Sequence, residues 1–563
     1  MQKSPAEMSN NSMKVNIDFI TAAPDGTFNI EGFISETPAT RLKVWCDNKE
    51  YTIKTIDRAF LDKNQFAFTV KINSKNIKRI IFLVDGKKTR IETRRWTQLG
   101  NISGAYRVIN HHMILRKYRK FLSARRYNLA LHIFYEISFL IRILFNLRIA
   151  CSIKLLKKKS VRSIIKSIAM PLWSFVGSLY AIFLRTAYHL MSKVDRIWLF
   201  ADRDSAAGDN GEAFFRYISS QQDNIKSYFI IDKKSSDFSR LSSIGRINNN
   251  KGFRYKLLFL TADKFFLSHP ELHTMNPFGG KIDCYADLIK VDFVFLQHGI
   301  TKDDISAWIN RYEMNFKLIV TSLKPEYDSF LSPSYGYNKS NLIKCGMPRY
   351  DLLTNAPANK IIIMPTWRKN LAGDFNNRTK QRDYNSNFKK SEYYAFYHNL
   401  LNDKVLQKVM NEHNLTGEFY LHPALEAQIK DFSSSGSFRI MSPPYDYKRV
   451  FSEGNLLITD HSSASFDFAY LKKPVLYCHF DIGNFYSGNH IFSRNFIPDS
   501  KFGMIVKDPN SVVAEIIKQI QNGCEMNREH VNHIDSLYFF RDHKNCERLL
   551  AAIQNYDKSK SIF

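Results

Sequence analysis

Apolar and polar positions alternate in short runs over the first hundred residues. Val15–Ile20 and Phe66–Ile72 are two such runs, and turn signals such as Asp85-Gly86 separate them. A period of two is typical of half-buried strands, and short strands at this spacing favour an antiparallel arrangement. We expect residues 14–100 to form a small β-sandwich-like accessory domain without catalytic groups, after a polar, disordered N-terminus at residues 1–13.

From residue 196 onward, apolar runs alternate with helical stretches. Runs such as Ile197–Phe200 and Ile361–Met364 contain no polar position, which indicates strands that are buried on both faces. Such strands fall into two sets, in residues 196–350 and 351–563, and the second set ends in a helix. We expect an α/β fold with two Rossmann-type domains, whose ligand lies at the carboxyl ends of the strands, in the cleft between the domains.

Polar residues come directly after four of these predicted strands. A histidine near neutral pH can take a proton from a hydroxyl group, and an arginine can bind phosphate through two parallel contacts. Each residue alone is more often structural, but their shared position at strand ends favours a functional site. The residues are His298 and Gly299, Thr366 and Arg368, His422, and Asp460, Ser462 and Ser463.

Two of these positions suggest particular geometry. Gly299 permits either a close approach of a ligand or a strained backbone turn next to His298. Ser462 and Ser463 fall where a predicted helix begins after a strand, so free N–H groups and the helix dipole favour an anion such as phosphate. Read singly, both serines are ordinary helix caps, and Asp467 is a solvated helix residue.

Positive charge is concentrated in one part of the chain. The 563 residues include 81 basic and 53 acidic side chains, a net charge of +28. Residues 101–193 hold 17 Lys or Arg and a single acid, interleaved with apolar runs. This pattern predicts a basic amphipathic helical region, residues 101–195, that binds an anionic membrane surface. A single span at Ser167–Leu184 and a soluble helical domain are the alternatives, and no nucleic-acid motif is present.

The cysteines and the first residues bear on location. Seven cysteines are scattered without the spacing of a zinc site, which fits reduced thiols, and no metal or other cofactor is expected. The segment Met1–Met13 is polar and does not look like a signal peptide. We expect a peripheral protein on the cytoplasmic face of the cell membrane.

Roughly the last 360 residues resemble the CDP-glycerol glycerophosphotransferase family, the teichoic-acid and capsule polymerases and primases of bacteria. Several ordered motifs carry the resemblance, and no single one would be specific. The first βα unit, Ile197–Tyr217, is similar as well. The motifs are Phe295–Gly299, Cys345–Asp351, Met364–Arg368, Leu421–Pro423, Ile458–Ser463 and Phe466–Tyr470.

The resemblance implies a GT-B-like architecture and an activity. A polyol phosphate would pass from a CDP-linked donor to a hydroxyl of a lipid-linked polymer acceptor, without a metal, and CMP would leave. The resemblance makes His298 the general base and His422 a contact of the donor phosphates. It implies substrate-binding roles for Gly299, Arg349, Thr366, Arg368, Asp460, Ser462, Ser463 and Asp467.

Three positions differ from the residues that the family commonly carries. They are Gln297 in place of Trp, His461 in place of Tyr, and Asp542–Asn545 without a glycine. These differences leave the donor open: CDP-glycerol is the first expectation, and CDP-ribitol or a nucleotide sugar are alternatives. A non-catalytic membrane scaffold is the alternative from another class, and an oligomer is left open.

Overall fold

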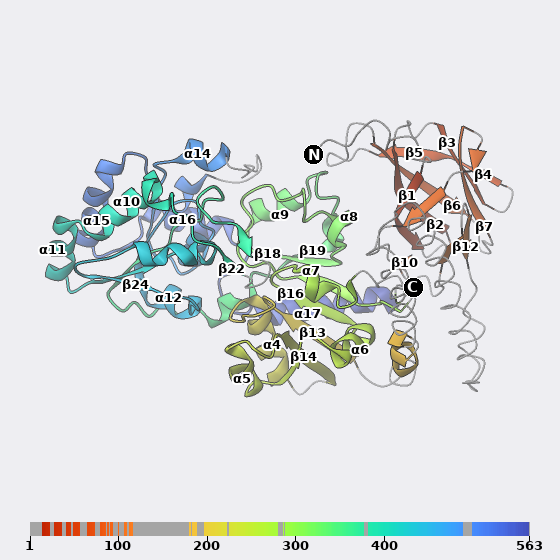
Figure 1. The fold of residues 1–563 in the computed structure, drawn as a ribbon, viewed down its shortest axis with the longest axis horizontal. Coiled ribbons are helices and arrows are strands. Elements are labelled where there is room, and N and C mark those ends of the chain that lie inside the picture. Colours follow the sequence, from red (N-terminus) through yellow and green to blue (C-terminus); the bar gives the residue numbers. More distant parts are fainter. Residues whose placement is uncertain are drawn as a thin grey trace, which may run out of the picture.

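The computed structural model describes three parts of the chain. They are residues 14–115 apart from most connections between strands, residues 180–188 except 182, and residues 196–561 except 222–223, 280–284, 286–287, 377–380 and 488–497. The predicted disorder of residues 1–13 and most of the basic region 101–195 lie outside the described residues. In Figure 1 the N-terminal sheets lie at the right, and two further α/β bodies follow to the left.

The N-terminal part consists of two six-stranded sheets that share one core. The first has the order β10-β1-β2-β6-β5 with β9 on β1, and the second β11-β12-β7-β3-β4 with β8 on β7. Ile30 and Phe68 from the first sheet and Val44 and Phe82 from the second are buried in the same cluster. The strands are β1 (Lys14–Ala22), β2 (Thr27–Ser35), β3 (Leu42–Cys46), β4 (Lys49–Tyr51), β5 (Ile53–Ile56), β6 (Gln65–Asn73), β7 (Arg79–Val84), β8 (Lys87–Lys88), β9 (Arg90–Thr93), β10 (Leu99–Gly100), β11 (Tyr106–Ile109) and β12 (His112–Leu115).

The strands β11 and β12 fall inside the region that was expected to be helical. They pair with each other antiparallel, and β12 also pairs with β7. Their sequences are short and rich in Tyr, Val, Ile and Met, and such residues take up a strand readily beside an existing sheet edge. The basic region therefore begins with two strands instead of a helix.

A seven-stranded parallel sheet forms the centre of the molecule. Its order is β15-β14-β13-β16-β17-β18-β19. Successive residues of β13 enter different cores, because Leu199 packs in one cluster and Trp198 and Phe200 in another. The run is apolar because both faces of this sheet are covered. The strands are β13 (Arg196–Ala201), β14 (Ile225–Ile231), β15 (Arg246–Asn249), β16 (Lys264–Leu267), β17 (Asp292–Phe295), β18 (Leu318–Thr321) and β19 (Leu342–Lys344).

A second parallel sheet has the order β24-β23-β20-β25-β26-β27. It is also covered on both faces, since Ile361 and Ile363 pack in one cluster and Ile362 in another. The two parallel sheets confirm the predicted α/β fold. We call residues 196–352 the first lobe and residues 360–538 the second lobe. The strands are β20 (Lys360–Ile363), β23 (Thr416–Tyr420), β24 (Phe438–Met441), β25 (Gly454–Thr459), β26 (Val475–Cys478) and β27 (Met504–Val506); β21 (Phe375–Asn376) and β22 (Gln381–Arg382) form a separate pair.

Helices and 3-10 turns connect the strands of both lobes. The first lobe has α4 (Asn210–Ser220), α5 (Asp237–Ser242), α6 (Phe253–Thr261), α7 (Leu272–Met275), α8 (Arg311–Met314), α9 (Lys324–Phe330), η4 (Lys339–Asn341) and η5 (Pro348–Leu352). The second has η6 (Phe388–Lys390), α10 (Glu392–Leu401), α11 (Lys404–Glu412), η7 (Pro423–Asp431), α12 (Tyr447–Glu453), α13 (Ala464–Tyr470), α14 (Ile482–Ser487), η8 (Asp499–Lys501), η9 (Pro509–Ser511), α15 (Val512–Gln521) and α16 (Arg528–Leu537).

The last helix, α17 (Asn545–Ser561), returns to the first lobe. Leu549 and Ile553 are fully buried in the same cluster as Trp198 and Phe200, and Figure 1 shows α17 beside the first parallel sheet. Asp351 holds its beginning, because the carboxylate accepts the N–H groups of Asn545 and Cys546 at 2.8 and 2.7 Å. The chain therefore links the lobes a second time.

No helix in the described part of the chain has both the length and the apolar composition that crossing a bilayer requires. Most of the candidate span Ser167–Leu184 lies outside the described residues.

Truncating the buried face of α17 tests this second link. Leu549→Ala removes a fully buried side chain, so we expect the free energy of unfolding, measured by urea denaturation, to fall by about 2–5 kcal/mol. Glu547→Ala on the exposed side of the same helix is the matched control, expected within about 0.5 kcal/mol of the parent. Equal effects of the two substitutions would contradict the packing.

Candidate active site

Three neighbouring strands of the first lobe end together. The last residues of β13, β16 and β17 pair in register, and Arg203, His269 and His298 follow these strands within three residues. The carboxyl edge of the sheet therefore brings one guanidinium and two imidazoles to the same place. This is the edge at which ligands of parallel sheets bind.

His298 is a neutral imidazole with access to solvent. The residue as a whole is exposed, and its ring stacks on that of His269, with the centroids 4.4 Å apart. Desolvation by the surrounding protein and the neighbouring His269 hold the pKa of His298 well below its usual range. The Nε2 atom of His269 lies 3.3 Å from a carboxylate oxygen of Asp209. A free, uncharged ring of this kind is able to accept a proton.

The strained backbone beside His298 is at the preceding residue, Gln297, and not at the following residue, Gly299. Gln297 has a left-handed backbone with φ of 63°. Its carbonyl oxygen accepts a hydrogen bond from the Asn210 side chain at 2.7 Å, and its amide donates to Glu326 at 3.0 Å. Such a conformation is unfavourable for a side chain other than glycine and persists only where the surroundings hold it. The strained turn considered for Gly299 is thus at Gln297.

Gly299 permits a close approach of the second lobe. A Cβ atom at this position would lie 2.7 Å from the hydroxyl oxygen of Ser463. The turn that carries His298 therefore touches the turn that carries the serine pair. Two of the predicted motifs, one from each lobe, meet directly.

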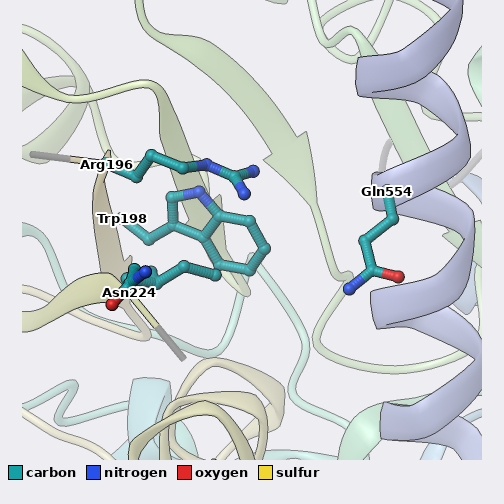
Figure 2. Close-up of a pocket in the computed structure, with 5 residues that line it drawn as sticks. Arg196, Trp198, Asn224 and Gln554 are labelled. Atoms are coloured by element: carbon teal, nitrogen blue, oxygen red, sulfur yellow. The ribbon is translucent and has the colours of Figure 1, made fainter. Parts of the chain in front are cut away.

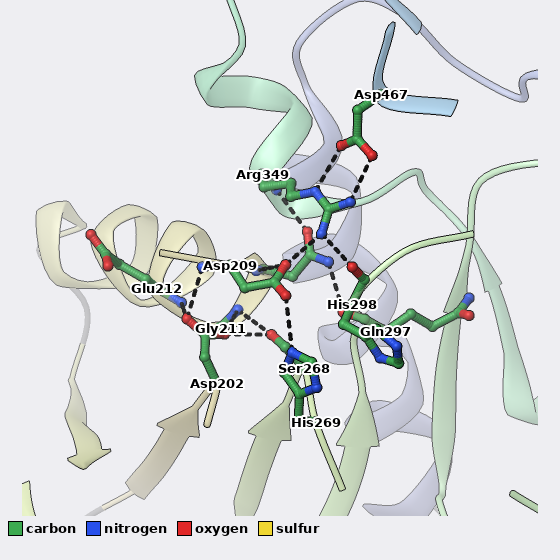
Figure 3. A network of polar contacts seen from close by, with 11 residues as sticks. Asp202, Asp209, Gly211, Glu212, Ser268, His269, Gln297, His298, Arg349 and Asp467 are labelled. Carbon is green, nitrogen blue, oxygen red and sulfur yellow. Dashed lines mark hydrogen bonds and ion pairs between the residues drawn. The ribbon is translucent and has the colours of Figure 1, made fainter. Parts of the chain in front are cut away.

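Arg349 joins the two lobes at this site (Figure 3). It donates to both carboxylate oxygens of Asp467 on α13 at 2.9 and 2.8 Å. Its Nη1 atom donates to Asp209 at 2.6 Å and to the carbonyl oxygen of His298 at 2.7 Å. Four of the five N–H donors of a guanidinium are thus used. The structure brings Arg349 and Asp467 to the predicted site, but their charges are engaged with each other.

Opposite charges set the ionisation of Asp209. Burial alone would raise the pKa of this carboxyl. The charges of Arg349 and His269 outweigh burial and hold the pKa well below its usual range. Asp209 is therefore a lasting negative charge beside the two stacked histidines. When His298 takes up a proton, this charge favours the imidazolium form.

A carboxylate of the protein already occupies the amino end of α4. Asp202 accepts the N–H of Gly211 at 2.8 Å, the hydroxyl of Ser268 at 2.5 Å and the N–H of Asp209 at 2.9 Å. Burial and the nearby Asp209 raise the pKa of Asp202 to about 7. This helix end is filled by the protein itself, as Figure 3 shows.

In the second lobe, Arg368 has a comparable role. Its guanidinium donates twice to Asp481, once to Asp460 and once to the carbonyl oxygen of Thr366, at 2.8 to 2.9 Å. Asp460 also accepts the N–H groups of Thr366 at 2.7 Å and of His461 at 2.6 Å. The side chain of Arg368 is only 5% exposed. These residues connect the turns after β20, β25 and β26.

His422 is a second neutral imidazole. Its Nδ1 atom accepts the N–H of Ala424 at 3.1 Å, which assigns the proton of the neutral ring to Nε2. Desolvation and the charge of Arg203 lower the pKa of His422 to about 4. The ring packs parallel to that of Trp367 at 6.0 Å. His422 therefore presents an N–H donor.

The serine turn starts a short helix. Ser462 accepts the N–H of Ala464 at 3.2 Å, and Ser463 is the N-terminal cap residue without a side-chain capping bond. The helix α13 has seven residues, so its dipole is smaller than that of a long helix. Both serines are half-buried, and Ser463 lies against the His298 turn at Gly299.

His461 belongs to a polar cluster behind this turn. It stacks on His479 at 4.5 Å, and Asp499 bonds His479 at 3.3 Å and Lys302 at 3.0 Å. Donor atoms of His461, His479 and Asp499 lie within 4.8 Å of one another. Stacked rings direct their lone pairs into separate planes, and Lys302 already neutralises the carboxylate. We therefore interpret the cluster as an ion pair between the lobes.

A small pocket lies at the other end of the first sheet. Arg196, Trp198, Asn224, Ile225 and Gln554 line a volume of about 210 Å³ between β13 and α17. Figure 2 shows Gln554 across from Arg196 and Trp198. Arg196 is the first residue of β13, whereas the site residues follow its last residue. This lining contains no carboxylate or histidine, so we assign it no chemical role.

Arg203 and His269 are site residues that were not predicted from the sequence. Both follow apolar strands directly, so the rule that identified His298 would have found them. Asp209 lies within the βα unit Ile197–Tyr217 but was not itself predicted as a site residue. Asp481 follows β26 in the same way.

These observations define a two-lobed α/β protein whose strand ends meet at an interlobe site. The family model described as CDP-Glycerol:Poly(glycerophosphate) glycerophosphotransferase matches residues 182–555. The chain belongs to this family, which confirms the resemblance of its motifs.

Individual relatives agree with the family. The minor teichoic acid biosynthesis protein GgaB of Bacillus subtilis (strain 168) is 36% identical over 385 residues, 68% of this chain and 42% of that protein. The teichoic acid poly(glycerol phosphate) polymerase of the same organism is 28% identical over 201 residues, 34% of this chain and 25% of that protein. The chain thus spans less than half the length of these relatives.

A solved structure of the wall teichoic acid polymerase TagF matches with a TM-score of 0.51 and 15% identity. The match covers 71% of this chain and 99% of that chain. At this identity, the likeness shows a shared fold.

Removing the Arg349 guanidinium tests the link between the lobes. Arg349→Met leaves the buried Asp467 without its partner, so we expect the free energy of unfolding to fall by about 3–5 kcal/mol. Arg216→Met is the matched control, because Arg216 is 40% exposed and Arg240 also pairs with its partner Glu212. For Arg216→Met we expect the free energy of unfolding to fall by about 1 kcal/mol or less. Similar losses in both variants would contradict a special role of Arg349.

Protonation of His422 gives a pH test. The folded pKa of about 4 lies below the value near 6.5 of an unfolded histidine, so between these values the unfolded chain binds more protons. Acidification from about pH 6.5 to 4 should therefore lower the free energy of unfolding. Histidine-selective NMR, with His422→Asn to assign the signal, should show the ring neutral at pH 5. A midpoint near 6.5 would contradict the environment described.

Proposed function

We propose that this chain transfers glycerol phosphate from CDP-glycerol to a hydroxyl of a membrane-linked acceptor and releases CMP, in teichoic acid or capsular polymer synthesis. The observation that carries the proposal is a pair of neutral histidines, His298 and His422, at strand ends of the two lobes in a member of this family. One ring can accept a proton and the other can donate a hydrogen bond.

The reaction assigns a role to each histidine. As the acceptor oxygen forms its bond to the phosphorus of glycerol phosphate, its proton passes to the His298 ring. The bond from that phosphorus to the oxygen of CMP breaks, and CMP leaves with the electron pair. The Nε2–H of His422 donates to the phosphate oxygens on which negative charge develops. His298 then returns its proton to solvent.

The surroundings of His298 suit a base that is charged only briefly. Asp209 and the stacked His269 lie beside the ring, and Arg349 holds its backbone carbonyl. A base positioned within hydrogen-bond reach of the proton it abstracts typically contributes a factor of about 10²–10⁴ to the rate. We propose that Arg349 and Asp467 act by positioning this loop.

Donor binding falls to the second lobe in this proposal. Ser462, Ser463 and Thr366 stand at the ends of β25 and β20, near the turn of Gly299. Arg368 and Asp460 hold these turns in place through their mutual ion pair. The arrangement of two Rossmann-type lobes around one site corresponds to a GT-B architecture.

The remaining parts would bring the site to its acceptor. We propose that the two N-terminal sheets form a β-sandwich-like accessory domain, and that the basic region 101–195 binds the anionic cytoplasmic face of the membrane. A lipid-linked acceptor would then reach the site from the bilayer. Flotation with anionic liposomes, with and without residues 116–179, tests this part of the proposal.

Substitution of the histidines tests the activity. We expect His298→Asn and His422→Asn each to lower the rate of CMP release from CDP-glycerol, with a lipid-linked acceptor present, by about 10²–10⁴-fold. His413→Asn is the matched control, because His413 is exposed at the end of α11, and it should leave the rate unchanged.

The same assay compares donors. CDP-ribitol and nucleotide sugars are offered in parallel with CDP-glycerol. CMP release from CDP-ribitol alone would move the proposal to ribitol phosphate, and turnover of a nucleotide sugar alone would overturn polyol-phosphate transfer. Full activity of both histidine variants would contradict their assigned roles.

A further inference from the structure

The two arginines expected to bind phosphate are committed elsewhere. Arg349 and Arg368 each direct four of five N–H donors to carboxylates and carbonyl oxygens of the protein. The histidines of the site are neutral. A donor diphosphate carries negative charge that must be balanced by another group.

Arg203 is a cation of this site whose charge is still available. Its side chain is exposed, and within the described part of the chain no ion pair or side-chain hydrogen bond engages it. It follows β13, whose end is in register with that of β16, so it lies beside the stacked pair of His269 and His298. Besides burial, its charge lowers the pKa of both His298 and His422. Arg203 thus acts on both lobes.

The loop that carries Arg203 is held in place. The backbone N–H of Arg203 donates to the carbonyl oxygen of Ala206 at 3.1 Å, which closes a turn. The N–H of Asp204 donates to Glu271 at 3.0 Å, and the carbonyl oxygen of Asp204 accepts the N–H of Asp232 at 2.8 Å. A backbone fixed on both sides presents the guanidinium with little loss of freedom on binding.

Among the described residues, no nearby carboxylate forms an ion pair with Arg203. Asp209 is paired with Arg349. Burial and the neighbouring Asp204 raise the pKa of Glu271 to about 7. Glu271 is moreover bonded to the backbone of the Arg203 loop.

We propose that Arg203 binds the diphosphate of the nucleotide donor between the two lobes. This inference rests on the proposed function and adds a ligand to that site. The planar guanidinium matches phosphate oxygens with two parallel hydrogen bonds. The first lobe thereby contributes both the base, His298, and the cation that orients the phosphorus toward the acceptor.

Binding measurements separate the phosphate contact from the rest of the site. Isothermal titration calorimetry is done on the full chain with CDP-glycerol, CDP and cytidine. We expect Arg203→Gln to lower the affinity for CDP-glycerol and for CDP by about 10–100-fold, the scale of a charged hydrogen bond. The affinity for cytidine should stay unchanged. Arg203→Lys should recover part of the affinity. Arg216→Gln, an exposed arginine on α4, is the control and should bind like the parent.

The outcomes distinguish this inference from the proposed function. If the parent chain binds CDP-glycerol and Arg203→Gln binds it equally well, the inference is overturned and the function stands. If the parent binds no CDP compound, the function and the inference fall together. Equal loss of cytidine and CDP binding in Arg203→Gln, with Arg203→Lys no better, shows a folding defect and also overturns the phosphate contact.

Discussion

The bidentate ion pair between Arg349 and Asp467 is the interaction on which the site depends. It crosses from the first lobe to α13, and the same guanidinium holds Asp209 and the carbonyl oxygen of His298. Burying two charges is costly, and an ion pair often gains little over apolar residues in stability. Its value here is geometric, because one planar group fixes the distance between the lobes and the position of the turn that carries His298.

Because Arg349 and Arg368 pair with carboxylates of the protein, their positive charge is not available to a ligand. Both arginines of the family motifs serve to hold turns, and in our proposal the positive charge that faces a ligand is that of Arg203. Neutral histidines suit such a site, since a protonated His298 could not accept a proton. The surroundings that keep His298 neutral also provide Asp209, which stabilises it once it is charged.

The sequence predicted where the buried strands and the polar residues after them lie. It did not predict which side chains contact one another across the fold. Apolar runs such as Ile361–Ile363 revealed strands buried on both faces, and polar residues after them marked the edge where the site lies. The partner of Arg349 is 118 residues away, and periodicity holds no information on contacts at that distance. The return of α17 to the first lobe and the strained backbone at Gln297 were missed for the same reason.

The contact between Gly299 and Ser463 joins the turn that carries His298 to the turn that carries the serine pair. Because a Cβ atom at position 299 would lie 2.7 Å from the Ser463 hydroxyl, any larger residue would push the turns of the base and the serine pair apart. The proposed base, His298, belongs to the first lobe and the serine turn to the second. In the proposed reaction, a relative movement of the lobes would change the angle between the attacking oxygen and the donor phosphates, and in-line displacement is sensitive to that angle. The interlobe contacts would thus constrain the proposed reaction as well as the fold.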